Sequence, residues 1–440
     1  MTIALRRGRV CASCETTQNR EEEEEGFPCA TKGLAIPPQY SSDCVCVCEN
    51  PEKGEKRREE RIRERSKEEE CEMGVGALLK KDVAVAEAPI VLGLQPSAMI
   101  DHVARVDWSL LHQISGEHGG SIPVELVELE NILREVKIHV LSCHDDDPSA
   151  ANVKTLAGGS VANTVRGLRS GFGISSGIIG ACGDDDQGEF FVHNMNFNGV
   201  DLSRLRKKKG HTAQCVCLVD DLGNRTMRPC LSTAVKVQAE ELTKEDFKGS
   251  KWLVLRYGIF NLEVIQAAIL LAKQEGLLVS LDLASFEMVR NFKEPLLKLL
   301  ESGNIDLCFA NEDEATELLR GGEQNADPET AVEFLAKYCQ WAVVTLGSNG
   351  CIAKHGNEIA RVPVIGEAKA KDATGAGDLF ASGFLYGVIK GMSLEECCQV
   401  GACSGGSVVR SLGGELTLDN LHWMYKHMQI MNLLTPNTAK

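Results

Sequence analysis

The chain has 440 residues and a formal net charge of −16, because 63 acidic side chains outnumber 47 basic ones. Binding to a phosphate backbone requires a positively charged face, so this balance argues against a nucleic-acid partner. The basic cluster at 206–209 is interpreted as a solvated turn. No stretch is long and apolar enough to span a bilayer, and no secretory apolar segment is recognisable. We therefore expect a cytoplasmic protein with no nucleic-acid partner and no membrane partner.

The first 72 residues differ in composition from the rest of the chain. Residues 21–25 are all glutamate, and residues 53–72 are almost continuously charged with few apolar side chains. Such a segment cannot bury enough surface to offset the entropy lost on ordering, so we expect residues 1–72 to be a disordered charged extension. Met73 is an alternative natural start, and native peptides from upstream of Met73 would disprove that hypothesis.

The chain contains 18 cysteines, in two kinds of surroundings. The extension includes Cys11, Cys14, Cys44, Cys46 and Cys48. Zinc sites favour C-x₂₋₄-C pairs, which the C-x-C-x-C run fits poorly, so no metal site is expected there. Other cysteines lie within apolar runs and are interpreted as small buried side chains in a reducing compartment; examples are Cys182, Cys215, Cys217, Cys308 and Cys403.

From residue 89 onward, short apolar segments alternate with segments of helical periodicity. Strands are predicted at 89–94, 174–181, 214–219, 225–230, 252–255, 277–283, 306–310, 342–346 and 359–364. Helices are predicted at 161–168, 189–198, 262–275, 292–302 and 379–389. Strands rich in Val, Ile and Leu between helices predict an α/β fold, with a mostly parallel sheet covered on both faces. The turn signal at 221–224 predicts a hairpin that interrupts this alternation.

Residues 371–380, Lys-Asp-Ala-Thr-Gly-Ala-Gly-Asp-Leu-Phe, connect a predicted strand to a predicted helix. Gly375, Ala376 and Gly377 therefore occupy a helix N-terminus, where exposed backbone N–H groups and the helix dipole attract an anion. Asp378 follows directly, where its repulsion of a bound anion would be costly without a purpose. A proton acceptor beside an anion site is what a hydroxyl attacking a phosphoryl group requires. The run predicts phosphoryl transfer with Asp378 as the general base.

This decapeptide resembles the C-terminal signature of the PfkB/ribokinase family of carbohydrate and nucleoside kinases. The segment Leu156-Ala-Gly-Gly-Ser-Val-Ala-Asn163 resembles the N-terminal glycine signature of the same family. The resemblance extends, with gaps, from about residue 90 to about residue 416. It implies a ribokinase-like three-layer α/β fold over residues 85–435, with a mostly parallel central sheet flanked by helices. It also implies a small β lid with strands from about 100–125 and 210–232.

The glycine signature implies an acceptor site. In the family it holds the substrate's sugar hydroxyls, here through Gly158, Gly159 and Asn163. Glycines allow a close backbone approach, and an asparagine offers both a donor and an acceptor to a diol. Asp101 matches the first-strand aspartate that binds substrate hydroxyls, although the spacing is one residue longer than in the family. Ser97 stands where the family commonly has asparagine.

The resemblance further implies a site for ATP and Mg²⁺. Glu314, in Asn311-Glu-Asp-Glu314, matches the Asn-x-x-Glu motif that organises Mg²⁺ and phosphate, and a first-turn acidic residue at a helix N-terminus is the plainer explanation. In several relatives the loop that holds Asp372 and Thr374 here shapes a site for a monovalent cation such as K⁺. The residues expected along ATP are Asn311, Thr345, Gly347, Gly350 and Thr374.

The substrate is left between several alternatives. The segments at 224–227, 281–286 and 305–315 look most like the adenosine-kinase branch, which implies a nucleoside acceptor. A free sugar such as fructose or ribose is the second alternative, and a catalytically idle regulatory member of the family is the third. Candidate aromatic side chains for stacking on a purine, each also interpretable as a core residue, are Phe172, Phe197, Tyr257, Phe260 and Phe286. Whether lid strands pair across a two-fold axis to form a homodimer is also left open.

Overall fold

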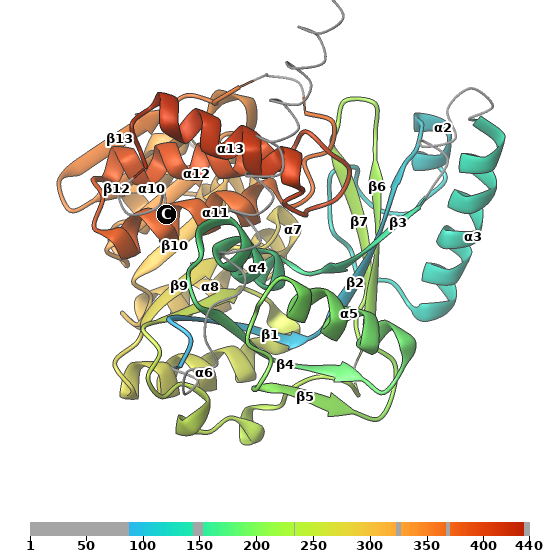
Figure 1. Ribbon diagram of the computed structural model, residues 1–440, viewed down its shortest axis with the longest axis horizontal. Coiled ribbons are helices and arrows are strands. Elements are labelled where there is room, and N and C mark those ends of the chain that lie inside the picture. Colours follow the sequence, from blue (N-terminus) through green and yellow to red (C-terminus); the bar gives the residue numbers. More distant parts are fainter. Residues whose placement is uncertain (1–87, 144–152, 233, 323–326, 367–369, 435–440) are drawn as a thin grey trace, which may run out of the picture. The chain divides into compact units, whose positions relative to one another are not determined.

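The computed structural model describes residues 88–143, 153–232, 234–322, 327–366 and 370–434 (Figure 1). The predicted disordered extension, 1–72, lies outside the described residues, and so do its five cysteines named above. All described residues belong to one compact unit, Met73–Lys440.

The larger of two sheets has nine strands in the order β13-β12-β11-β10-β9-β8-β1-β4-β5. The strands, in that order, are Glu358–Val362, Cys351–His355, Trp341–Thr345, Leu307–Asn311, Leu278–Asp282, Trp252–Arg256, Val91–Ser97, Ser176–Gly183 and Leu205–Lys208. Every neighbouring pair is parallel except β11–β12 and β12–β13 at one edge. The predicted mostly parallel α/β sheet is therefore confirmed.

Helices cover both faces of this sheet. Along β8, Leu253 and Leu255 belong to one apolar cluster while Trp252 and Val254 belong to another, because successive side chains of a strand point to opposite faces. The first cluster includes α6 (Leu262–Gln274), α8 (Lys293–Glu301), α9 (Glu312–Leu319) and α10 (Pro328–Leu335). The second includes α4 (Ser160–Phe172), α11 (Ala376–Lys390), α12 (Leu394–Val408) and α13 (Leu418–Ile430). The result is a three-layer arrangement (Figure 1).

A second sheet has four strands in the order β3-β2-β6-β7. The strands are Lys154–Gly158, Met99–Arg105, Ala213–Val219 and Arg225–Cys230. Of the two segments expected to supply a lid, the first contributes β2 and the second contributes the hairpin β6–β7. Between β2 and β3 lie two helices that the sequence analysis did not anticipate, α2 (Trp108–Leu111) and α3 (Leu126–Cys143), which pack against one face of this sheet (Figure 1).

The tip of the β6–β7 hairpin is bonded to the loop that precedes α11. The Ala373 N–H donates to the Gly223 carbonyl oxygen at 2.9 Å, and the Arg105 guanidinium on β2 donates to the Lys371 carbonyl oxygen at 2.8 Å. Gly223 has φ of 83°, and a Cβ atom there would fall 2.7 Å from the Ala370 carbonyl oxygen. A glycine is therefore needed where the small sheet meets this loop.

The five cysteines expected to be buried within the globular part are all buried. Among the residues that the structure describes, no helix is both long enough and apolar enough to cross a membrane.

Candidate active site

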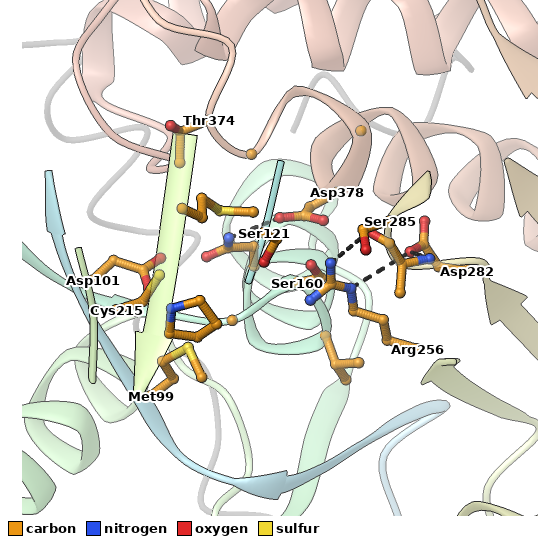
Figure 2. A pocket seen from close by; sticks show the side chains of 18 of the residues that line it. Met99, Asp101, Ser121, Ser160, Cys215, Arg256, Asp282, Ser285, Thr374 and Asp378 are labelled. Atoms are coloured by element: carbon orange, nitrogen blue, oxygen red, sulfur yellow. Dashed lines mark hydrogen bonds and ion pairs between the residues drawn. The ribbon is translucent and has the colours of Figure 1, made fainter. Parts of the chain in front are cut away.

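Both sheets contribute to a single cavity of about 1390 Å³ (Figure 2). It lies where strands of the large sheet end at their carboxyl ends, the usual ligand position in open α/β sheets. Of the residues predicted from the sequence for catalysis, acceptor binding, ATP and Mg²⁺, all line this cavity except Gly158. Those that line it are Asp101, Gly159, Asn163, Asn311, Glu314, Thr345, Gly347, Gly350, Thr374, Gly375, Ala376, Gly377 and Asp378.

The N-terminus of α11 forms the base of the predicted anion site. Its N-cap, Gly375, has φ of 76°, and a Cβ atom there would fall 2.7 Å from the Cα atom of Gly414. Glycine is required at this position on both counts. At Gly377 a Cβ atom would meet nothing within 4 Å, so the backbone there is open toward the cavity. The Gly375 and Gly377 N–H groups are thus available to a ligand, whereas the Ala376 N–H already donates to the Ala373 carbonyl oxygen at 3.2 Å.

Asp378, in the first turn of α11, is held by a residue 215 positions away in the chain. Asn163 Nδ2 donates to Asp378 Oδ2 at 2.8 Å. Burial raises the pKa of the Asp378 carboxyl, and the hydrogen bond from Asn163 and the nearby cations Arg256 and Arg225 counteract part of that effect. A raised pKa suits a group that must accept a proton near neutral pH.

Asn163 connects Asp378 to a buried arginine. Its Oδ1 accepts a hydrogen bond from Arg166 Nη2 at 2.7 Å, and the other terminal nitrogen of Arg166 bonds Asn194 Oδ1 at 2.9 Å. The Arg166 side chain is only 4 % exposed. An asparagine amide has two donor hydrogens and two acceptor lone pairs, so Asn163 retains one of each for a substrate.

The two signature glycines allow neighbouring side chains to pack closely against the backbone. Only Gly159 lines the cavity. A Cβ atom at Gly158 would fall 2.1 Å from Asp101 Cγ, and one at Gly159 would fall 2.4 Å from Gln95 Oε1. Gln95 closes this turn, because its Nε2 donates to the Gly158 carbonyl oxygen and its Oε1 accepts from the Ala162 N–H. The absence of a side chain at Gly158 thus leaves the space that the Asp101 carboxyl group occupies.

Asp101 projects from β2 of the small sheet and is 8 % exposed. Burial, with a further contribution from the negative charge of Asp378, raises the pKa of Asp101 to about 7. The electrostatic coupling means that the two carboxylates face a common region of the cavity. A hydroxyl placed there meets two acceptors, one from strand β2 of the small sheet and one from helix α11.

Asn311 and Glu314 form a reciprocal cap at the start of α9. The Asn311 backbone N–H and side-chain Nδ2 donate to the two Glu314 carboxylate oxygens at 2.8 and 2.9 Å, and Asn311 Oδ1 accepts from the Glu314 N–H at 2.9 Å. The first-turn capping interpretation is therefore confirmed, and Glu314 also lines the cavity. Burial, followed by the charge of Asp282, raises the pKa of Glu314 to about 8.

Arg256, Asp282 and Gln95 line the cavity but were not singled out from the sequence. Arg256 and Asp282 are the last residues of β8 and β9, and Gln95 lies two residues before the end of β1. Arg256 Nε lies 3.8 Å from Asp282 Oδ1 (Figure 2). Burial raises the pKa of Asp282 to about 6, and Arg256 opposes this effect. The signal that could have found Arg256 and Asp282 is their position as charged residues that end largely apolar strands.

The loop before α11 is fixed by a buried carboxylate. Asp372 is fully buried, and its two oxygens accept from the backbone N–H groups of Thr374 and Gly413, both at 2.7 Å. Thr374 Oγ1 is buried and has no hydrogen-bond partner. Buried hydroxyl groups normally have a hydrogen-bond partner, so the Thr374 hydroxyl beside the cavity is suited to binding a ligand.

Only two of the five aromatic candidates for purine stacking line the cavity, Tyr257 and Phe260. The other three do not line it, and for Phe172 the alternative interpretation as a core residue is confirmed. Phe172 stacks on Tyr386 in the core with ring centroids 4.6 Å apart, Phe197 is a surface residue with 79 % exposure, and neither it nor Phe286 lines the cavity.

The fold and the site define a ribokinase-like phosphotransferase, with a mostly parallel sheet, a helix N-terminus that opens on the cavity and an adjacent carboxylate. Residues 128–421 match the model of a family described as pfkB family carbohydrate kinase, so the chain belongs to that family. It is an ATP-dependent kinase of the carbohydrate and nucleoside class.

The chain is similar both to sugar kinases and to adenosine kinases. The chain is 26% identical over 252 residues to an uncharacterized sugar kinase of Archaeoglobus fulgidus, covering 56% of this chain and 95% of the relative. It is 25% identical over 310 residues to adenosine kinase 2 of Arabidopsis thaliana, covering 65% and 87%. The crystal structure of adenosine kinase from Sinorhizobium meliloti superposes with a TM-score of 0.68 at 27% identity, covering 78% of this chain and 99% of that one.

Proposed function

We propose that the protein transfers the terminal phosphoryl group of ATP to a ribose hydroxyl of a nucleoside, with Asp378 as the general base. The observation that carries this proposal is the placement of the Asp378 carboxylate in the first turn of α11, at 2.8 Å from Asn163 Nδ2 and inside the shared cavity. A base must lie beside both the attacking hydroxyl and the site of the phosphoryl group, and a carboxylate next to a helix N-terminus inside the cavity supports this role.

The chemistry follows from the chain's own groups. Asp378 accepts the proton of the acceptor hydroxyl. At the same time the hydroxyl oxygen bonds to phosphorus, and the bond between phosphorus and the ADP oxygen breaks. The backbone N–H groups at Gly375 and Gly377 stabilise the negative charge on the phosphoryl oxygens during transfer, and the Ala376 N–H joins them only if it leaves the Ala373 carbonyl oxygen. Arg256 and Arg225 favour the ionised form of Asp378, so they help to keep the base ready to accept a proton.

The acceptor lies between the two sheets in this proposal. Asp101 and the remaining hydrogen-bonding capacity of Asn163 orient its hydroxyls, while Gly159 leaves room for the Gln95 side chain at the edge of the cavity. Contact between the Gly223 tip and the loop at 370–374 supports a closed arrangement of the small sheet, which excludes water that would otherwise accept the phosphoryl group.

The donor set suits a divalent cation. Glu314 is buried and Asp282 is partly buried, and the pKa values of these neighbouring carboxylates are raised to about 8 and about 6, so a cation between them would relieve an unfavourable charge arrangement. Mg²⁺ is held in such sites by one or two carboxylates and water, and when bound it neutralises charge on the ATP phosphates. The unpartnered Thr374 hydroxyl fits the expectation that this loop also accepts a monovalent cation such as K⁺.

Apolar side chains around the acceptor region favour a nucleoside over a free sugar. Met99, Met227 and Leu231 of the small sheet and its continuation line the cavity, as do Tyr257 and Phe260. A purine would cover these surfaces, whereas a free sugar would leave them against water. The cavity of about 1390 Å³ also exceeds the roughly 300–1,000 Å³ typical of a single-ligand site, which suits two substrates.

The test is ATP consumption by the full chain with Mg²⁺, measured against adenosine, guanosine, inosine, cytidine, ribose and fructose. The Asp378→Asn variant provides the blank for contaminating kinases. We expect turnover with at least one nucleoside that exceeds turnover with either sugar and disappears in the variant.

Two other outcomes have definite meanings. Turnover confined to ribose or fructose would keep the mechanism and reject the nucleoside. ATP binding without turnover on any acceptor would reject the proposal in favour of a regulatory member of the family.

A further inference from the structure

Two thiols and a carboxylate meet at the acceptor end of the cavity. Cys215 and Cys217 are alternate residues of β6 and so point to the same face, with their Sγ atoms 3.8 Å apart. In the parallel pairing of β2 with β6, Asp101 lies directly opposite Cys215. Figure 2 shows these two side chains next to each other at the cavity.

The three groups have the dimensions of a metal site. One ligand atom from each of Asp101, Cys215 and Cys217 lies within 4.8 Å of the others, and all three side chains are buried. Two thiolates bound to one Zn²⁺ at about 2.3 Å in tetrahedral geometry are about 3.8 Å apart. Two thiols in simple van der Waals contact would show a similar spacing, so the nearby carboxylate is the distinguishing feature.

A second close thiol pair in the chain shows the difference. Cys351 and Cys398 also form a thiol–thiol hydrogen bond, within the apolar core beneath α12. Among the described residues, only the group at Asp101 brings three metal-binding side chains together. The cavity beside Asp101 and Cys215 leaves space for a water molecule as the fourth ligand, as in zinc sites with three protein ligands.

We propose that Asp101, Cys215 and Cys217 bind Zn²⁺, or another soft divalent cation of similar size, and that the bound ion blocks the acceptor site. Binding the ion replaces the two thiol protons, which are released to solvent. The ion then occupies the Asp101 carboxylate that the acceptor hydroxyl needs, so zinc and acceptor compete. The blocking step rests on the proposed function of Asp101, whereas the binding step does not.

Metal binding is tested without turnover, by titrating the reduced full chain with Cd²⁺ and recording the ultraviolet charge-transfer absorption of Cd–thiolate bonds. Because the chain holds other cysteines, each variant is compared with the unmodified protein. We expect Cys217→Ala to lose one equivalent of Cd²⁺ bound. Cys398→Ala, which removes one thiol of the pair that lacks a carboxylate, should lose none.

Equal Cd²⁺ binding by the unmodified protein and Cys217→Ala would overturn the proposal. If Cys217→Ala does not fold, Cys215→Ser removes the other thiolate and the same comparison applies. Asp101→Asn provides a further check, because it keeps both thiols and should still weaken Cd²⁺ binding.

Blocking is tested by the zinc concentration that halves turnover, expressed relative to each variant's own activity. For Cys217→Ala this concentration should rise about tenfold or more, whereas for Cys398→Ala it should not change. Added acceptor should relieve the inhibition, and so should a zinc-selective chelator. Inhibition that is independent of acceptor concentration would overturn the blocking step.

The two proposals fail separately. Cd²⁺ binding that depends on Cys217, in a protein that phosphorylates no acceptor, would keep the metal site and reject the proposed function. Turnover on a nucleoside without such binding would do the reverse.

Discussion

Replacing Asn163 by alanine tests whether this side chain holds Asp378 in its ionised form. The substitution removes the 2.8 Å hydrogen bond from Nδ2 to Asp378 Oδ2. A hydrogen bond to a charged group contributes about 1.5–3 kcal/mol, and about 1.4 kcal/mol corresponds to a tenfold change in rate. We therefore expect kcat/KM near pH 7 to fall by roughly 10- to 100-fold.

The pH dependence gives a sharper test than the rate alone. Asp378 works as a base only when ionised, so activity is lost as the pH falls through its pKa. The Asn163 hydrogen bond lowers the pKa of Asp378 against the effect of burial. Its removal therefore raises that pKa, and the acidic limb of the kcat/KM profile should move to higher pH.

A matched control separates this effect from general damage around Arg166. Asn194→Ala also removes a hydrogen bond to the Arg166 guanidinium, at 2.9 Å, but makes no contact with Asp378. We expect this variant to leave the acidic limb in place. The reasoning would be refuted by an unmoved limb in Asn163→Ala, or by the same displacement in Asn194→Ala.

Three further predictions concern the loop, the helix and the cation. Gly375→Ala should lower kcat about tenfold or more through strain at the proposed anion site. The control is Gly391→Ala at the other end of α11, where φ is 70° and the space is open. This variant should lower the free energy of unfolding in denaturant by only about 1 kcal/mol. Gly223→Ala should push the hairpin tip away from Ala370 and raise acceptor-independent ATP hydrolysis, measured as ADP formed without acceptor; an unchanged value would contradict the closure. Because the pKa of Glu314 is raised from 4.5 to about 8, the metal-free folded protein should lose stability as the pH rises from about 4.5 to 8. Mg²⁺ should therefore raise Tm more at pH 8 than at pH 6. The Glu314→Gln variant should abolish that difference.

Local sequence signals predicted those parts of the fold that local interactions determine. The β6–β7 hairpin was predicted to within one residue, because its turn sequence strongly favours a tight reversal. Helix α3 was missed although Leu129, Ile132 and Val136 have helical spacing and are buried against the small sheet. Its remaining positions are largely charged or exposed, so the apolar stripe is narrow.

The anion site could be predicted because its chemistry lies in consecutive residues. The bond between Asn163 and Asp378 could not, since it joins residues 215 positions apart and depends on how α4 packs against α11. Arg256 belongs to no local motif, and the segment 281–286 was used only for its resemblance to one branch of the family. The two side chains come together because β8 and β9 end side by side.

The measurement that tests the central claim most directly is kcat of Asp378→Asn beside Asp419→Asn, with the best nucleoside acceptor. Asp419 is an exposed first-turn aspartate on α13, so its variant controls for loss of a helix N-terminal charge. We expect kcat to fall by roughly 10²- to 10⁴-fold in Asp378→Asn with binding of ATP and nucleoside retained by calorimetry, and to stay unchanged in Asp419→Asn. Near-normal kcat in Asp378→Asn would contradict the assignment of this carboxylate as the base.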